Sequence, residues 1–304
     1  MAKARRLLRL VSAIIRKETM TEKMAPLENK DVIEINYDLI RARERAEMKK
    51  RSFINFMLGV IGIGAFLLVW MLVIKLELVD RKLIVSPLEV VQEVFNKFYD
   101  KKPDGALLYE HVAASLKISL SGFILANLIG IPLGLVMGWY RNIDRFIRPI
   151  FEVIRPIPPI AWIPIMVVLL GIGLKSKMVI IFFSAFIPSL INSYTGIRLT
   201  NQVYINVGKT CGASTFSNFI HIGVPSALPM IFAGMKVSLG NSWSTLVAAE
   251  MLAATQGLGY FIMMGRTFAR VDVIIAGMII IGIIGIILTS LLELLERKVI
   301  KWKV

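Results

Sequence analysis

The sequence lacks most of the side chains on which catalysis and metal binding depend. Its 304 residues include one cysteine, Cys211, so an internal disulfide is excluded. His111 and His221 are the only histidines, and with a single cysteine they form no cluster of metal ligands. No Ser/His/Asp or paired-carboxylate arrangement stands out. A membrane-embedded enzyme is therefore disfavoured.

Charge is also scarce for a chain of this length. Charged residues make up 19% of the sequence and hydrophobic residues 56%, with a mean hydropathy of +0.69. A soluble domain carries more charge, and the apolar surface is too large for a disordered chain. The net charge of +15 is compatible with nucleic-acid binding, but the basic residues lie in short segments between apolar blocks. The positive-inside bias of membrane proteins explains them better, so we expect no nucleic-acid partner.

What the sequence does contain is long apolar blocks. Each has about 20 residues, which is enough to cross a hydrocarbon core of about 30 Å. Because lipid offers the backbone no hydrogen bonds, such blocks must be helical. The sequence therefore predicts an all-α, polytopic membrane protein with about six transmembrane helices. The blocks are 53–74, 118–140, 156–174, 178–198, 227–249 and 273–292.

Polar segments divide the chain and predict its orientation. Residues 1–51 form a basic N-terminal extension, and residues 52–304 form the transmembrane domain. Within the extension, residues 1–18 read either as a basic amphipathic helix on an anionic membrane or as a frayed tail. Lys and Arg favour a cytoplasmic location for both termini. The segments assigned to the cytoplasm are 1–52, 141–148, 199–226 and 293–304.

Glycine recurs at intervals of four in the second block, at Gly130, Gly134 and Gly138. Small residues at this spacing share one helix face and allow another helix to approach closely. The row indicates either a tight interface near a translocation path or ordinary packing within a bundle.

Proline interrupts the third block in the run 155–164, where Pro156, Pro158 and Pro159 are followed by Pro164. Proline removes a backbone donor and suits a first helical turn better than a helix interior. The first three prolines are expected to start the span and Pro164 to kink it, with a gate or pore lining nearby.

The cytoplasmic loop at about 199–226 is too long for a simple hairpin. Gly212 permits a sharp turn, Ser214 can cap a short helix and Pro225 is expected to end it. Such a helix could dock into a groove on a partner protein or lie on lipid. The residues expected to share its apolar face are Phe216, Phe219 and Ile220.

Polar residues in the fifth block mark a candidate translocation path. Intramembrane polar residues normally face a bundle interior or a water-filled path. Lys236 and Glu250 are too far apart along a helix to pair, and the face between them includes Trp243, with Asn241 toward its edge. For Lys236, snorkelling to the interface is the alternative. The amide and indole donors of Asn241 and Trp243 suit an anionic solute.

The segment from Val207 to Glu250 resembles the "EAA" region of ABC importer permeases that work with a binding protein. Gly212 and Pro225 match the signature glycine and proline, while the E-A-A triplet is degenerate at Asn206-Val207-Gly208. Further matching motifs lie at Leu83–Pro87, Gly130–Gly134, Arg155–Pro159, Ala248–Leu252 and Gly257–Tyr260. Together these motifs look most like the nitrate/sulfonate/taurine/bicarbonate branch of the family.

This resemblance implies a type I ABC importer permease in a bacterial inner membrane. It implies a homodimer with two ATPase subunits, an extracytoplasmic binding protein and a small anionic solute. ATP-Mg is expected on the partner subunits and no cofactor on this chain, because Gly208-Lys209-Thr210 lacks the glycine that a phosphate-binding loop needs five positions earlier. Residues implied in ATPase coupling are Lys209, Gly212, Ala213, Ser214, Phe216, Phe219 and Pro225.

The alternative is an ion-coupled secondary transporter or channel. That class predicts inverted repeats and intramembrane carboxylates. Only Glu250 is a candidate for such a carboxylate. The residues assigned to the translocation path are Lys236, Asn241, Trp243 and Glu250.

Overall fold

The computed structural model describes residues 29–78 and 84–301, so the predicted helix or tail at residues 1–18 lies outside the described residues. The described part is helical and contains no strand. It divides into two units, one ending at Val69 and the other beginning at Trp70. The described part of the first unit is the helix α2, Asn29–Lys75, up to Val69, and the stretch Phe53–Lys75 of this helix is apolar enough to cross a membrane.

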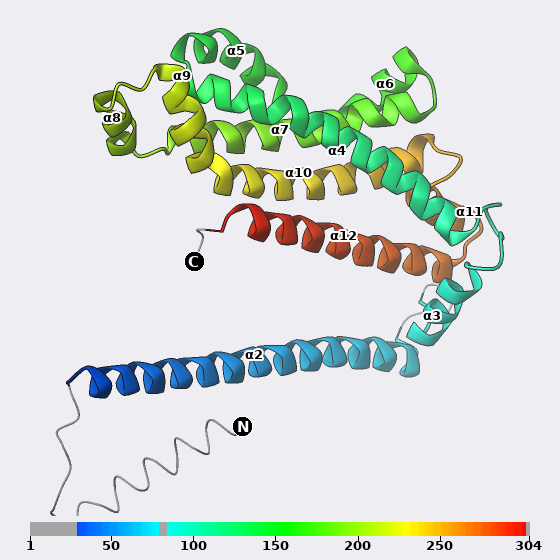
Figure 1. Ribbon diagram of the computed structural model, residues 1–304. Helices are drawn as coiled ribbons and strands as arrows, with labels where there is room; N and C mark the ends of the chain where they lie inside the picture. Colours follow the sequence, from blue (N-terminus) through cyan, green and yellow to red (C-terminus); the bar gives the residue numbers. More distant parts are fainter. Residues whose placement is uncertain (1–28, 79–83, 302–304) are drawn as a thin grey trace, which may run out of the picture. The chain divides into compact units, whose positions relative to one another are not determined.

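The second unit is a bundle of four long helices with short helices at both ends (Figure 1). The long helices are α4 Leu108–Trp139, α7 Leu174–Arg198, α10 Val224–Ala253 and α12 Val271–Val299. The short ones are α3 Pro87–Asn96, α5 Arg141–Ile154, a 3₁₀ turn Pro159–Trp162, α6 Ile163–Leu170, α8 Gln202–Thr210, α9 Thr215–Asn218, a π-helical turn Phe219–Gly223 and α11 Leu258–Thr267.

Helix α7 lies between α4 and α10 and packs along both of them. The predicted glycine row of α4 forms the first of these interfaces. A Cβ on Gly130 would lie 3.2 Å from the ring of Phe186, and one on Gly134 would lie 3.0 Å from Cβ of Ser193. The row is therefore confirmed as a close helix–helix contact, in which the absence of side chains brings the two backbones together.

The third predicted block, 156–174, is not a single straight span. Helix α5 ends at Ile154, and after the turn at residues 155–158 the chain continues as the 3₁₀ turn and α6, bent by 79° from α5. Proline explains the break, since Pro156, Pro158 and Pro159 deny backbone donors to a continuous helix. The described residues thus contain five helices that could cross a membrane, or six if the bent pair is counted as one span.

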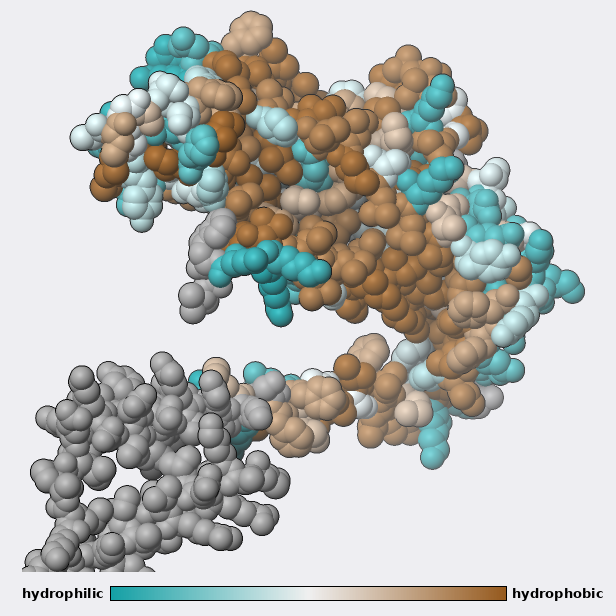
Figure 2. Space-filling model, viewed as in Figure 1, coloured by the Kyte–Doolittle hydropathy of each residue, from teal (hydrophilic) through white to brown (hydrophobic). Residues whose placement is uncertain are grey.

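The bundle surface separates into an apolar middle and two polar ends. On the face drawn in Figure 2, apolar residues cover the long helices, and hydrophilic residues gather around α5 and α8 at one end and around α3 and α11 at the other. We call these the α8 end and the α11 end. A belt of this kind is the surface that a bilayer requires.

The sequence predicted that a short helix ends at Pro225, and this prediction is wrong. Helix α9, the π-helical turn and α10 follow one another without a gap, and together they form one candidate span, Thr215–Leu252. Pro225 lies in the first turn of α10, directly after the π-helical turn, and a local widening of the helix is one way in which a chain accommodates a missing backbone donor. The expected end of a short helix is therefore the start of a long one.

Candidate functional site

The turn that leads into α9 has the two local features that the sequence predicted. Gly212 has φ +81°, a left-handed conformation that favours glycine, and nothing lies within 4 Å of the position a Cβ would take. Ser214 is the N-cap of α9, and its hydroxyl accepts a hydrogen bond from the Ser217 N–H at 3.1 Å. Both predictions are confirmed. Lys209 is exposed, and Ala213 is half-buried beside Gly212.

The predicted aromatic face of this segment is only partly available to a partner. Phe216 is 66% exposed and Ile220 is 40% exposed, whereas Phe219 is 8% exposed. The ring of Phe219 packs against Trp139 and Tyr140 at the end of α4, with centroids 5.7 and 5.9 Å away. The expectation that Phe219 shares an exposed face is wrong. The π-helical turn begins at this residue, and Phe219 lies against the bundle.

Helix α8 packs against α9 and the π-helical turn through Gly208. A Cβ on Gly208 would meet the side chain of Asn218, which is 2% exposed and donates to the Ile205 carbonyl at 3.5 Å. The glycine that departs from the E-A-A pattern is therefore required by its neighbour. Gly208-Lys209-Thr210 lies in the last turn of α8, so it is helix and not a phosphate-binding loop.

A groove of about 570 Å³ lies between α8 and the start of α10. Its lining is mainly apolar, and Pro225 contributes to one wall. An open, apolar groove with an exposed aromatic residue in its wall, here Tyr204, is suited to contact with another protein. The lining residues are Tyr204, Val207, Gly208, His221, Ile222, Pro225 and Ser226.

Lys236 is paired with carboxylates of α12. Its ammonium lies 2.7 Å from Glu296 and 3.5 Å from Glu293, and the side chain is 31% exposed. The interaction joins the α8-end halves of α10 and α12. A cation that far into an apolar helix is costly without a partner, and two carboxylates on the neighbouring helix supply one. The sequence predicted either snorkelling or the solute path for Lys236, and neither prediction includes this ion pair.

Asn241 and Trp243 do not line a common surface, which corrects the expectation of one shared face. Asn241 is exposed. Trp243 is 7% exposed, and its indole N–H donates to the Ile281 carbonyl of α12 at 3.0 Å. Two residues along a helix differ in direction by about 200°, so one side chain faces outward and the other joins α10 to α12.

Glu250 is fully buried near the end of α10. The Ser115 hydroxyl lies 2.8 and 2.9 Å from its two carboxylate oxygens, and the Gly259 N–H donates to it at 2.9 Å. The Leu258 N–H donates in turn to the Ser115 hydroxyl at 2.9 Å. Gly257 has φ +130°, and a Cβ there would collide with the Glu250 carboxylate. Glu250 therefore holds the start of α11 against α4, an interior position rather than an open one.

A second buried cluster adjoins Glu250 at the α11 end. The Gly257 N–H donates to Nδ1 of His111 at 3.1 Å, and Nε2 of His111 lies 2.7 Å from Asp104. Since Nδ1 accepts a hydrogen bond, the ring nitrogen left to face Asp104 as a donor is Nε2. Lys97 completes the cluster through an ion pair with Asp104.

The side chains of this cluster are fully buried. Burial alone raises the pKa of Asp104, but the hydrogen bonds from His111 and Lys97 and the charge of Lys97 outweigh it, so the pKa of Asp104 lies below its ordinary value. Among the described residues, no group of three His, Cys, Asp or Glu side chains could hold a metal ion.

Polar contacts that the sequence reading missed cross the middle of the bundle. Asn127 of α4 accepts a hydrogen bond from Ser189 of α7 and donates to Ser238 of α10 at 3.3 Å. Ser184 of α7 contacts the Thr245 hydroxyl at 2.7 Å. Small polar residues of this kind link helices within a membrane. The one sequence feature that indicates these interhelical hydrogen bonds is the presence of serine and asparagine within apolar blocks.

Comparisons with known proteins agree with this geometry. Residues 130–301 match the family described as "Binding-protein-dependent transport system inner membrane component". The chain is 35% identical over 245 residues to the taurine transport system permease protein TauC of Escherichia coli, covering 81% of this chain and 89% of that protein. It is 32% identical over 265 residues to the nitrate import permease protein NrtB of Synechocystis, covering 85% and 95%.

A solved structure is similar in fold. A chain from the structure described as inward-facing conformations of the MetNI methionine ABC transporter aligns with a TM-score of 0.54 and 19% identity. The alignment covers 63% of this chain and 95% of that one. At this level of identity the likeness concerns the arrangement of helices alone.

Proposed function

Because this chain belongs to the family of binding-protein-dependent transport system inner membrane components, and is therefore a multi-pass permease subunit of an ABC importer, we propose that it forms the path for a small oxyanion. Its relatives named for taurine and nitrate transport support that solute class. The family match supports this function over an ion-coupled secondary transporter or channel. Ligand identification on the cognate binding protein is the direct test of the solute.

The proposed assembly contains two copies of this chain, two ATPase subunits and an extracytoplasmic binding protein. Family membership supports the ATPase and the binding protein. In this assembly ATP-Mg is bound by the ATPase subunits and no cofactor by this chain. The α8 end faces the cytoplasm, along with both termini. The arginines of α5 support that orientation through the positive-inside bias.

The observation that carries the proposal is the continuity of the helix from α9 into α10. Thr215–Leu252 spans 38 residues, or roughly 55 Å. At its α9 end the side chains of Phe216 and Ile220 are exposed on the surface of the chain, and its other end carries the buried Glu250. A movement imposed on α9 by a docked ATPase would therefore act directly on a helix that crosses the bundle. Lys209, Gly212, Ala213, Ser214 and Pro225 shape the turn and the groove beside this contact.

The four residues assigned to the solute path take two different roles in this proposal. Asn241 lies on the exposed side of α10 together with Gly240 and Ser244, and we assign it to the path surface. Lys236, Trp243 and Glu250 fix the position of α10 through α12, α4 and α11. Asn241→Leu should therefore change solute uptake with normal assembly, whereas Trp243→Ala should also lower the stability of the complex.

Phe216→Asp tests the docking surface. Phe216 is 66% exposed, so the change should leave the bundle intact, but it would bury a charge in a docking groove at a cost of several kcal/mol. We expect the ATPase no longer to co-purify. Leu199→Asp, at a residue 69% exposed at the same end, is the matched control. Retention of the ATPase and of transport-stimulated ATP hydrolysis by Phe216→Asp would refute the assignment.

A further inference from the structure

A pocket of about 720 Å³ opens at the α8 end, apart from the groove beside α9. It lies where α4 ends, α5 begins and the chain passes from α7 to α8. Gly138 forms part of its floor, because the lack of a side chain there lets α4 approach Tyr194 and Ile197 of α7. The volume is in the range of small-ligand sites. The lining residues are Gly138, Trp139, Arg141, Asp144, Arg145, Arg148, Ile197, Arg198, Thr200, Gln202 and Ile205.

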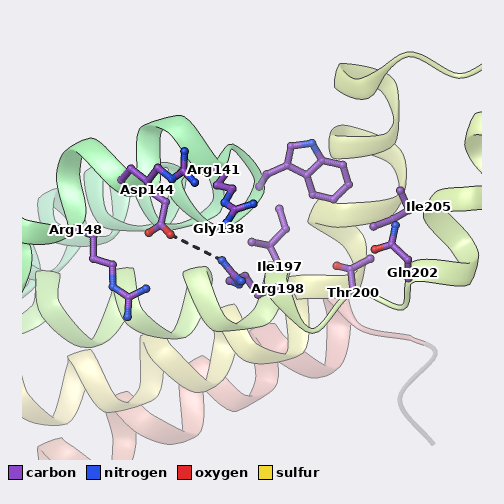
Figure 3. A pocket seen from close by; sticks show the side chains of 11 residues that line it. Gly138, Arg141, Asp144, Arg148, Ile197, Arg198, Thr200, Gln202 and Ile205 are labelled. Carbon is purple, nitrogen blue, oxygen red and sulfur yellow. Dashed lines mark ion pairs between the residues drawn. The ribbon is translucent and has the colours of Figure 1, made fainter.

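The pocket has a strong excess of positive charge. Arg141, Arg145 and Arg148 follow one another at i, i+4 and i+7 and so share one face of α5. Arg198 enters from α7 and lies 3.8 Å from Asp144, the one carboxylate in the lining. Figure 3 shows this pair facing each other, with Arg148 to one side and Thr200 and Gln202 to the other.

Two of the arginines have no partner within the described part of the chain. Arg148 pairs with Glu152 at 3.6 Å, outside the pocket. No hydrogen bond or ion pair joins Arg141 or Arg145 to another described residue. Two guanidinium groups on one helix face, next to a third that is already paired, form a site for an oxyanion that can accept several hydrogen bonds.

Two buried polar atoms in the lining are also unsatisfied. The Thr200 hydroxyl, on a residue 8% exposed, and Oδ1 of Asp144, on a residue 6% exposed, have no hydrogen-bond partner among the described residues. A buried polar atom left unpaired is costly. The hydroxyl can donate to an oxyanion, whereas the carboxylate oxygen needs a ligand that donates. The ligand that would satisfy both atoms is an anion that also carries a hydroxyl or N–H group.

The position of α5 places this pocket at a membrane surface. On the side of α5 opposite its arginines, Phe146, Ile150 and Val153 are 77%, 57% and 73% exposed. A helix with one basic and one apolar face lies along the boundary between lipid and water. Trp139 and Tyr140, at the end of α4, are the aromatic types enriched at that boundary.

We propose that the pocket binds the glycerol-phosphate group of an anionic lipid. Arg141 and Arg145 pair with the phosphate, Thr200 donates to it, and a glycerol hydroxyl donates to Asp144. Basic pockets between membrane helices are suited to anionic head groups, and a phosphate with a neighbouring hydroxyl satisfies each unpaired group named above. A free glycerol phosphate has the same chemistry, and the experiment separates the two sources.

The test uses the complete permease–ATPase complex in detergent, titrated with phosphatidylglycerol or phosphatidylcholine and followed by native mass spectrometry. We expect one phosphatidylglycerol per permease chain in preference to phosphatidylcholine. Arg141→Gln with Arg145→Gln should weaken that binding at least about tenfold, the usual loss for hydrogen bonds to a charged group. Thr200→Val should weaken it less. Arg297→Gln with Lys298→Gln removes two exposed charges from the end of α12 and serves as the matched control.

Competition identifies the source of the ligand. Displacement of phosphatidylglycerol by excess sn-glycerol 3-phosphate supports recognition of the head group. Arginine-dependent binding of sn-glycerol 3-phosphate without any lipid preference supports the pocket but assigns it to a free ligand. Equal lipid binding by the pocket variant and the control variant overturns the proposal. So does loss of the ATPase from the pocket variant with unchanged lipid binding, which would make the pocket a protein contact.

Discussion

Gly212 and Gly134 require glycine for different reasons. Gly212 has φ +81° and open space around it, so its requirement is conformational. Gly134 is helical and lies against the backbone of α7, so its requirement is steric. The sequence predicted a turn at Gly212 and a helix contact at Gly134, and both predictions are confirmed. A single residue type thus supports the coupling turn and the bundle by separate mechanisms.

Gly212→Ala should strain the turn before α9 by about 1–2 kcal/mol, the usual penalty for a Cβ in the left-handed region. We expect faster amide hydrogen exchange in α8 and α9 and reduced ATPase stimulation, with the bundle unchanged. Gly282→Ala is the control, because Gly282 is helical with nothing within 4 Å of its Cβ position. Equal exchange in the two variants would contradict the assignment.

The cluster of Asp104, Lys97 and His111 makes a prediction about pH. The pKa of Asp104 is lowered in the folded chain, so its charge stabilises the fold fully above the ordinary value of 3.8. That stabilisation is lost as pH falls further, through the folded pKa. The contribution of this group to thermal stability of the wild-type chain in detergent should therefore be constant between pH 7 and pH 5 and should decline below about pH 4.

Asp104→Asn should remove that contribution at neutral pH. It leaves Lys97 buried without its ion pair, at a cost of about 3 kcal/mol. The melting temperature at pH 7 should fall, and the decline below pH 4 should flatten. Asp100→Asn, at an exposed carboxylate of the same loop, is the control. A melting temperature equal to that of the control at pH 7 would show that the buried cluster does not stabilise the chain.

Hydropathy predicted where most of the membrane-spanning helices lie, but the sequence did not predict which side of each helix is buried. Five of the six predicted blocks coincide with long helices, because a run of about 20 apolar residues has few other solutions in lipid. The block at 156–174 is the exception. Its first three prolines stand at the start of the helical segment, as predicted, but that segment, Pro159–Leu170, ends at Gly171 and is too short to cross a membrane without α5. The local signals of Gly212 and Ser214 were readable because a turn and a cap depend on near neighbours alone.

Contacts between distant elements could not be read from the sequence. Phe219 is buried because α4 ends beside it, and Lys236 is paired because α12 returns along α10. Asn241 and Trp243 differ in exposure for the same reason: the neighbours of α10 decide which of its sides is covered. The pairing of Glu250 with Ser115 joins residues 135 positions apart, and no local pattern contains that information.

Ser115→Ala tests whether this pairing holds α11 in place. The change removes the hydroxyl contacts to Glu250 and the acceptor for the Leu258 N–H. We expect faster amide exchange at residues 257–259 and a loss of stability of about 1–3 kcal/mol, because polar groups are left buried and unpaired. Ser121→Ala is the control, since that hydroxyl donates only to the Ile118 carbonyl of its own helix. Identical exchange in the two variants would argue against the assignment.

The whole molecule has the surface and the helices of a membrane subunit that works in an assembly. The family match defines its class, and the similarity to a chain of the MetNI methionine ABC transporter structure concerns its fold alone. The proposed partners supply ATP hydrolysis and solute capture. In that proposal two copies of this chain form the barrier and the path, and the ATPase subunits supply the energy of transport.

The purified chain in ATP-free liposomes should show no saturable solute uptake. Uptake should appear only when ATPase, ATP and binding protein are all present, because hydrolysis must drive the change between helix arrangements. A complex whose ATPase carries an inactive phosphate-binding loop is the control. Saturable uptake down a gradient by the chain alone would favour the secondary transporter instead.

The ties along α10 have a mechanical consequence. Glu250 holds one end of the helix to α4 and α11, Lys236 holds the other half to α12, and Phe219 packs the π-helical turn against the end of α4. A rod that is tied to its neighbours along its whole length cannot swing alone. A push on α9 would therefore displace α10 together with the helices around it, as one rigid block. The stroke delivered at the ATPase side would then reach Asn241 nearly undiminished.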